Sequence, residues 1–137
     1  MKLLLAPCLA LAFLAPTPAQ AEDGPLKVLV HINFPETGTQ GAGLRSVANI
    51  LKSDPEARIE VVCHAAGIGL MEKARSEHAE AVEAHIKKGV TFVACENTMR
   101  QKSIRKEDLI PGVGTVPSGA VEVVRKQQKD GYAYFKP

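Results

Sequence analysis

The chain has 137 residues, of which 45% are hydrophobic, 23% charged and 4% aromatic, and it contains no tryptophan. This length corresponds to about one domain, and the share of apolar residues excludes an intrinsically disordered chain. The formal charge of +2 is too small to indicate nucleic-acid binding, and so few aromatic residues offer single strands no stacking platform. Three cysteines do not make a disulfide scaffold.

The first 21 residues have the pattern of a cleaved secretory signal. A short positive start precedes an apolar run over 3–15, and Ala19-Gln20-Ala21 has the small-x-small spacing of a signal peptidase site. The run is too short for a membrane span, and Cys8 lies inside it directly after a proline, which argues against lipidation. We therefore expect a mature chain over 22–137, exported to the periplasm and free of the membrane.

Apolar runs alternate with helical patterns along the mature chain. Strands are predicted at 27–34, 58–63, 90–95, 114–117 and 132–135, and helices at 42–53, 70–88, 103–109 and 119–129, the last with Ser118 as N-cap. The segment 35–43 is interpreted as a Gly-rich loop. The alternation predicts one α/β domain whose parallel sheet is covered on both faces.

In such sheets the functional residues follow the carboxyl ends of the strands. The predicted ends carry His31 and Asn33, Cys63 and His64, Cys95, and the pair Ser118-Gly119. Glycines 41 and 43 are candidates for anion binding through backbone N–H groups. Their spacing matches neither G-x-G-x-x-G nor G-K-[ST], so we expect no nucleotide cofactor.

Cys95 is the most informative of these residues. It ends a strand and precedes a polar segment and a helix start, an environment that lowers a thiol pKa and makes it reactive. Cys63 lies among valines and is interpreted as a buried hydrophobe. A Cys63–Cys95 disulfide is not favoured, because adjacent parallel strands seldom bring the Cα and Cβ atoms into disulfide geometry.

A metal site is a weaker interpretation. His31, Cys63, His64, Cys95 and Met99 include soft ligands suited to Cu(I), but they have no compact spacing. His78 and His85 lack partners at metal-ligand spacing and are interpreted as surface or packing residues. No metal is therefore expected.

Four segments resemble the DsrE/DsrF/DsrH-like family, most closely its exported branch, over essentially the whole mature chain. They are Val61-Val-Cys-His-Ala-Ala-Gly-Ile68, Gly89-Val-Thr-Phe-Val-Ala-Cys-Glu-Asn-Thr-Met99, Val116-Pro-Ser-Gly119 and Gly131-Tyr-Ala-Tyr-Phe-Lys-Pro137. The resemblance implies a three-layer α/β/α sandwich with a five-stranded parallel sheet in the order 4-3-2-1-5, and a homo-oligomer, often a trimer or hexamer. Cytoplasmic relatives carry sulfur as a persulfide on a strand-end cysteine. The cysteine of this chain that matches the family's A-C-x-N-T-M segment is Cys95.

The first functional hypothesis is therefore sulfur handling through Cys95, with Asn97 and Thr98 orienting or stabilising the anion. Its partners would be sulfur donor and acceptor proteins or small thiols. The alternatives are a binding module without turnover, which uses the strand-end residues and the Gly-rich segment for a small ligand, and a copper or redox site. An exported copy is separated from the cytoplasmic relay partners, so the fold transfers more directly than the activity.

Overall fold

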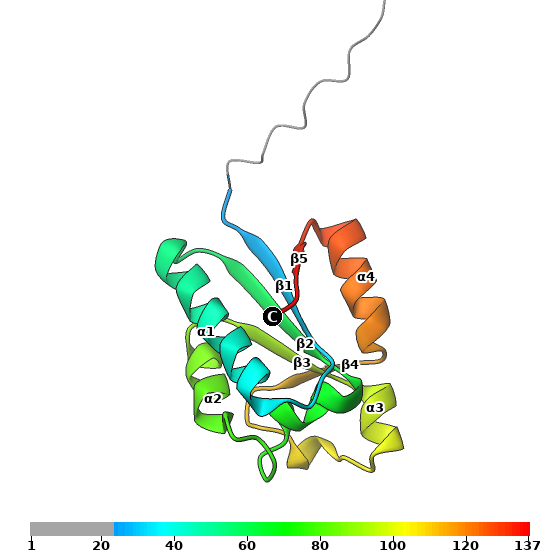
Figure 1. The fold of residues 1–137 in the computed structure, drawn as a ribbon. Helices are drawn as coiled ribbons and strands as arrows, with labels where there is room; N and C mark the ends of the chain where they lie inside the picture. Colours follow the sequence, from blue (N-terminus) through cyan, green and yellow to red (C-terminus); the bar gives the residue numbers. More distant parts are fainter. Residues whose placement is uncertain (1–23) are drawn as a thin grey trace, which may run out of the picture.

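A computed structural model describes residues 24–137, so the predicted signal sequence lies outside the described residues. Five strands form one sheet in which every pairing is parallel, in the order β4-β3-β2-β1-β5 (Figure 1). This confirms the α/β class and the strand order that the resemblance implied. The strands are β1 (Lys27–Ile32), β2 (Arg58–Cys63), β3 (Thr91–Cys95), β4 (Gly114–Val116) and β5 (Ala133–Phe135).

Helices lie on both faces of the sheet. The α-helices are α1 (Thr37–Ser53), α2 (Ala79–Lys87), α3 (Glu96–Gln101) and α4 (Gly119–Asp130), and the 3-10 helices are η1 (Ala65–Met71) and η2 (Lys106–Asp108). Figure 1 shows α1 and α2 on one face and α4 on the other, with α3 near the carboxyl ends of the strands. None of the helices described is long and apolar enough to cross a membrane.

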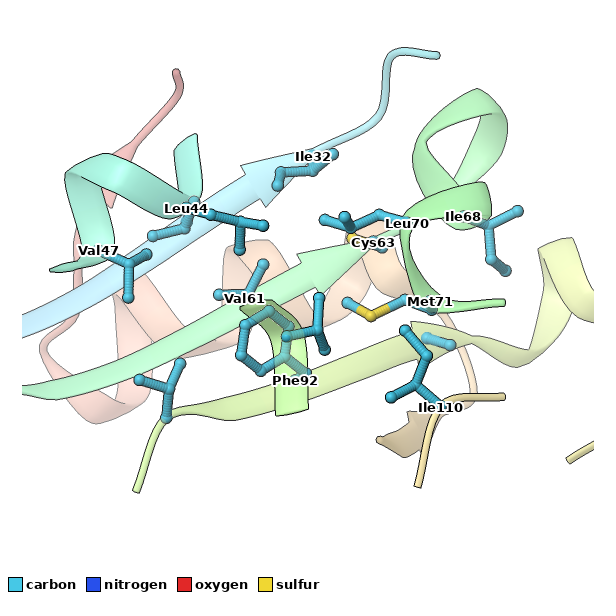
Figure 2. Packing of buried hydrophobic residues seen from close by; sticks show 14 of the residues in the cluster. Ile32, Leu44, Val47, Val61, Cys63, Ile68, Leu70, Met71, Phe92 and Ile110 are labelled. Carbon is cyan, nitrogen blue, oxygen red and sulfur yellow. The ribbon is translucent and has the colours of Figure 1, made fainter. Parts of the chain in front are cut away.

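The larger part of the core lies between the sheet and the α1–α2 layer. Figure 2 shows Cys63 among Ile32, Leu44 and Leu70, with Phe92 beside Val61. The face under α4 has a much smaller cluster, formed by Leu29, Val62, Val93 and Val123. The two clusters take alternate residues of β1, β2 and β3, so the direction of each side chain at the ends of these strands follows from its position in this alternation.

The predicted Gly-rich loop is wrong, because α1 already begins at Thr37 and contains these glycines. An added Cβ at Gly41 would lie 2.8 Å from Cε1 of His78, and one at Gly43 would lie 2.8 Å from Cγ of Pro137. These close approaches offset the cost of glycine in a helix, about 1 kcal/mol each relative to alanine. The two glycines are therefore packing positions of α1.

The predicted helix over 70–88 is also interrupted. Backbone N–H groups of Lys73 and Ile110 donate to the carbonyl oxygens of Asp108 and Met71, respectively. These bonds hold the 71–73 segment beside residues 108–110, and α2 begins only at Ala79. Tertiary pairing has replaced the helical hydrogen bonds that local propensity favours.

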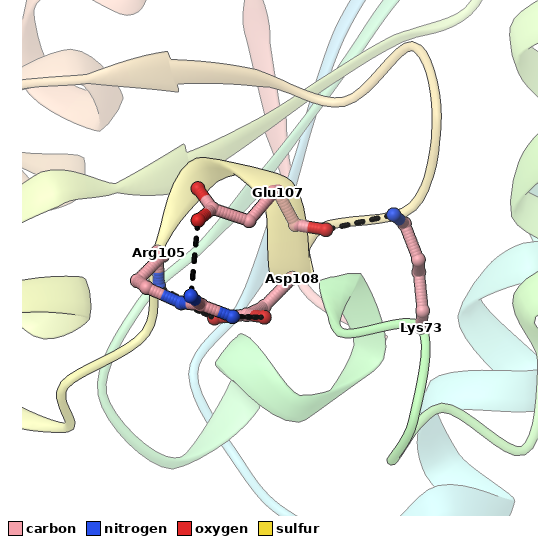
Figure 3. Close-up of polar contacts among 4 residues, drawn as sticks. All are labelled: Lys73, Arg105, Glu107 and Asp108. Atoms are coloured by element: carbon pink, nitrogen blue, oxygen red, sulfur yellow. Dashed lines mark hydrogen bonds and ion pairs between the residues drawn. The ribbon is translucent and has the colours of Figure 1, made fainter.

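A surface cluster fixes the same junction from the outside. Nζ of Lys73 donates to the carbonyl oxygen of Glu107 at 2.7 Å, and Arg105 pairs with the carboxylates of Glu107 and Asp108 (Figure 3). Exposed pairs of this kind contribute little stability, so we assign the cluster a local role in shaping η2. It is not part of the functional site.

Candidate functional site

The strand-end residues divide between the two faces of the sheet according to a one-residue alternation. Cys63 is fully buried in the α1–α2 cluster, and its register partner on β3 is Ala94, so Cys95 is one position further along. Successive strand residues point to opposite faces. Cys63 and Cys95 therefore leave the sheet on opposite faces, and both are free thiols, in agreement with the expectation that they form no disulfide.

Cys95 is the N-cap residue of α3 and faces the start of α4. Burial would raise the pKa of its thiol, but N–H groups of Gly119, Thr98 and Asn97 and the Thr98 hydroxyl favour the thiolate and lower the pKa below the ordinary value. Sγ makes no capping hydrogen bond of regular geometry, as expected of a weak thiol acceptor. The surroundings are thus set for an anion on sulfur.

Two further contacts hold this arrangement in place. The N–H of Ala65 donates to Oγ1 of Thr98 at 3.0 Å, which leaves the hydroxyl proton of Thr98 available to sulfur. Ala65 has a left-handed backbone (φ 51°), a conformation that costs about 1–3 kcal/mol in a non-glycine residue and concentrates at functional sites. The N–H of Asn97 also donates to the carbonyl oxygen of Pro117 at 3.3 Å, which joins α3 to the turn before α4.

Gly119 brings Cys95 and His64 close together. A Cβ at Gly119 would lie 3.0 Å from Cβ of His64 and 3.2 Å from Cβ of Cys95. Only a residue without a side chain leaves both in place, and the same glycine supplies an N–H group to the sulfur. The start of α4 is set by Ser118, whose Oγ accepts from the N–H of Val121 at 3.4 Å, and this confirms the predicted N-cap.

Cys95 is only 4% exposed, but it lies just below the surface. Its neighbours Ala65, Asn97 and Pro117 are all exposed. Burial by contrast raises the pKa of the Cys63 thiol, which lies in an apolar core. The two cysteines thus differ in the direction of the pKa shift as well as in the face they occupy.

Beside Cys95 lies a pair of histidines that are hydrogen-bonded to each other. Nε2 of His31 and Nε2 of His64 are 2.6 Å apart, and the two ring planes differ by only 15°, with centroids 4.8 Å apart. Nδ1 of His31 in turn meets the Tyr134 hydroxyl at 2.7 Å. Each residue was visible in the sequence, but only the pairing of β1 with β2 and β5 joins them.

Both histidines are held neutral at physiological pH. Burial, His64 and the nearby Lys136 ammonium lower the pKa of His31 to about 4. Burial and Lys136 also lower the pKa of His64. A neutral imidazole has one N–H donor and one acceptor nitrogen, so one ring of the pair donates and the other accepts.

The C-terminal segment closes one side of this site. Nζ of Lys136 donates to Oδ1 of Asn33 at 2.6 Å, and the ammonium lies 5.6 Å from the ring centroid of Phe34. Sequence reasoning missed Tyr134 and Lys136 as site residues, because they are distant from the strand-end cysteine in the chain. The quoted G-Y-A-Y-F-K-P segment was the signal that could have found them.

The remaining candidates lie apart from this cluster. The Asn97 side chain accepts from Arg100 at the surface, so its backbone N–H, and not its amide, acts on Cys95. His78 and His85 contribute to packing between α1 and α2, with Nε2 of His78 2.8 Å from the carbonyl oxygen of Thr37. Within residues 24–137 no three His, Cys, Asp or Glu side chains are arranged to hold a metal ion.

A surface hollow of about 480 Å³ lies at the opposite end of the sheet, between Leu26, Arg58 and Gly131. It is therefore not part of the Cys95 site. Because Gly41 and Gly43 lie beyond the first turn of α1, their N–H groups are part of the helix and withdrawn from ligand binding. The binding-module alternative consequently loses the Gly-rich loop and retains the strand-end residues.

Comparison with known proteins is consistent with this architecture. A family model described as the DsrE/DsrF-like family matches residues 27–137. The protein of unknown function MTH1491 from Methanobacterium thermoautotrophicum is 32% identical with a TM-score of 0.77, over 82% of this chain and 99% of that chain. The ychN protein from E. coli is 13% identical with a TM-score of 0.69 over the same shares, which shows the fold alone. No curated protein matches.

Proposed function

Because this chain belongs to the DsrE/DsrF-like family, which is linked to sulfur relay, we propose that it carries sulfane sulfur as a persulfide on Cys95. The observation that supports this most strongly is the set of N–H groups from two helix starts, together with the Thr98 hydroxyl, around one thiol whose pKa they lower. A thiolate is both the attacking and the leaving group in sulfur transfer. Stabilising it therefore assists loading and release alike.

The loading step is a displacement at sulfur. The Cys95 thiolate attacks the sulfane sulfur of thiosulfate, a new S–S bond forms, and the S–S bond of thiosulfate breaks with its electron pair leaving on sulfite. Release is the same step in reverse order: an acceptor thiolate attacks the outer sulfur and Cys95 leaves as a thiolate. Neither step needs an external oxidant or reductant.

Intact-mass measurement after treatment with thiosulfate or inorganic polysulfide tests the proposal. The wild-type protein and Cys63→Ser should gain the mass of one sulfur atom, reversibly with dithiothreitol, and Cys95→Ser should gain none. Cys63→Ser is the matched control because Cys63 lies on the other face of the sheet. A sulfur adduct that persists in Cys95→Ser, or none in the wild type, would overturn the proposal, whereas a copper adduct would favour the redox alternative.

Alkylation supplies a second test that requires no sulfur donor. Iodoacetamide at pH 6–7 should modify Cys95 before Cys63, since the pKa of Cys95 is lowered and that of Cys63 is raised by burial. Peptide mapping of partly alkylated protein identifies the first site. Labelling of Cys63 first would contradict the assignment.

We also propose that the protein acts as a homo-oligomer outside the cytoplasm. Apolar Val121 and Val124 on α4 are 62% and 50% exposed, and this face has the smaller of the two core clusters. Sedimentation should show a trimer or hexamer, and Val121→Glu should shift it toward the monomer.

The signal pattern predicts that the exported protein begins at Glu22. N-terminal sequencing tests this prediction, and a start at Met1 would refute it.

A further inference from the structure

Lys136 places a cation at the carboxyl edge of the sheet, where an acceptor thiol must approach Cys95. The residue follows β5 and is exposed. Within residues 24–137 its ammonium forms no ion pair with a carboxylate. Nζ donates to Oδ1 of Asn33 at 2.6 Å, and an ammonium has three N–H donors. Two donors and the positive charge are therefore available to an anion.

We propose that Lys136, with Asn33 beside it, binds the carboxylate of the acceptor thiol and so selects anionic thiols of peptide length. This inference rests on the persulfide function proposed above. The acceptor attacks as its thiolate, after its proton has passed to solvent, and forms an S–S bond to the outer persulfide sulfur. The S–S bond to Cys95 breaks and its electron pair stays on Cys95. The carboxylate takes no part in this exchange, so Lys136 is a positioning residue.

The ammonium is held in place from two sides. Besides the hydrogen bond to Asn33, Nζ lies 5.6 Å from the centroid of the Phe34 ring, a distance at which the ring face attracts a cation. The following residue, Pro137, lies against α1, because an added Cβ at Gly43 would be 2.8 Å from its Cγ. Pairing of β5 with β1 holds the backbone before Lys136. The charge therefore has a defined position at this edge.

The field of the ammonium extends toward the sulfur. It lowers the pKa of both His31 and His64. His64 and Cys95 in turn share the close approach to Gly119. Because both rings are neutral, they add no charge of their own, and both are only half-buried. Lys136 thus supplies the positive charge on this side of the sulfur.

The separation of the two groups sets the length of the acceptor. Asn33 follows the last residue of β1, and Cys95 is the last residue of β3, with β2 between them. Neighbouring strands lie about 4.8 Å apart, so the ammonium at Asn33 and the sulfur of Cys95 are on the order of 10 Å apart. An extended tripeptide spans about 10 Å. Thiosulfate is much shorter and cannot reach both groups, so we assign Lys136 to the acceptor and not to the sulfur donor.

Transfer to two matched acceptors tests the site. The protein is loaded with inorganic polysulfide, separated from it, and mixed with glutathione or with glutathione diethyl ester, which lacks both carboxylates. Lys136→Gln should slow transfer to dilute glutathione by about 2- to 5-fold, as expected for an exposed ion pair, and should not slow transfer to the ester. The half-saturating glutathione concentration should rise while the rate at saturation stays the same, because a positioning group binds the acceptor equally before and during transfer.

Two further variants separate position from charge. Lys136→Arg keeps the cation and should keep the wild-type ratio of the glutathione rate to the ester rate. Lys129→Gln is the matched control, because Lys129 is also exposed but lies in the last turn of α4, near the opposite end of the sheet. It should leave the ratio unchanged. A wild-type ratio in Lys136→Gln, or an equal loss of preference in Lys129→Gln, would show that the assignment is wrong.

Binding of S-methylglutathione supplies a readout that is independent of transfer, because its sulfur is blocked. The backbone amide NMR signals of Asn33 and Lys136 should shift during its titration into the wild type, and Lys136→Gln should require a higher concentration for the same shift. If the wild type takes up no sulfur, the persulfide function fails and this titration still decides the carboxylate site. If every variant transfers sulfur with the wild-type ratio, the persulfide function stands and the site is overturned. An absence of shifts in the wild type overturns it as well.

Discussion

Replacement of Gly119 by alanine tests whether the approach of His64 and Cys95 is as close as the structure shows. The new methyl group would lie 3.0 Å from Cβ of His64 and 3.2 Å from Cβ of Cys95. Both neighbours are Cβ atoms fixed to the backbone, so neither can move away by a rotation of its side chain. Overpacking of this kind costs about 1–3 kcal/mol.

Gly38 is the matched control, because it also lies in the first turn of a helix and has nothing within 4 Å of an added Cβ. Alanine restricts the unfolded chain at either position, which stabilises by about 0.4–1 kcal/mol. Gly119→Ala should therefore be less stable than Gly38→Ala by about 1–3 kcal/mol. With a urea m-value of about 2 kcal/mol/M, this difference moves the denaturation midpoint by about 0.5–1.5 M.

The same variant should raise the pKa of Cys95, because the Gly119 N–H is the first of the donors that favour its thiolate. The measurements are urea denaturation and the pH dependence of Cys95 alkylation, each compared with Gly38→Ala. Equal denaturation midpoints together with an unchanged alkylation profile would show that Gly119 of α4 is not in close contact with His64 and Cys95. The reasoning from the Gly119 contact would then fail.

Three further outcomes follow from the contacts described. Burial raises the pKa of Glu60 despite its 2.8 Å ion pair with Lys126, so the folded state holds the Glu60 proton more tightly than the unfolded state does. The wild type should therefore lose stability relative to Glu60→Gln as the pH rises from the usual glutamate range toward neutrality. Chemical denaturation at pH 4 and 7.5 measures this, with the exposed Glu56→Gln as the matched control. Ser118→Ala should cost about 0.5–2 kcal/mol by loss of the α4 N-cap, as read from the denaturation midpoint. Cys63→Ser should cost about 1–3 kcal/mol by placing a hydroxyl in the apolar core, with no change in the rate of Cys95 alkylation; an altered rate would mean that the two faces are coupled.

The local pattern of apolar residues in the sequence was sufficient to predict the position of most strands of the sheet. Short apolar runs predicted β2 over its whole range and the other strands within one or two residues of their observed bounds. Ser118 and Gly131 similarly mark the start and end of α4, because an N-cap hydroxyl and a left-handed glycine act within one helical turn. Strand order followed from a resemblance to a family and not from pattern.

The helix predicted at 103–109 is wrong, because α3 occupies Glu96–Gln101 and only the short 3-10 helix η2 lies within the predicted range. Two other wrong predictions share one cause. Glycines at 38, 41 and 43 suggested a loop, but in α1 the close approach of His78 and Pro137 outweighs the poor helix propensity of two of them. Likewise, the Ala- and Glu-rich stretch from residue 70 suggested a helix, and long-range hydrogen bonds to residues 108–110 interrupt it. Local propensity amounts to a fraction of a kcal/mol per residue, so a few tertiary contacts reverse it.

For the site, the sequence determined which residue types reach the carboxyl edge of the sheet and singled out Cys95 among the cysteines. Tertiary structure alone decided that Cys63 and Cys95 face opposite sides, because their separation depends on a one-residue difference in strand register. It alone also joined His31, His64 and Tyr134, which are far apart in the chain and meet only where three parallel strands end together. The chemical character of a single side chain can be inferred from the sequence, whereas a hydrogen bond between residues of distant strands exists only after the sheet has formed.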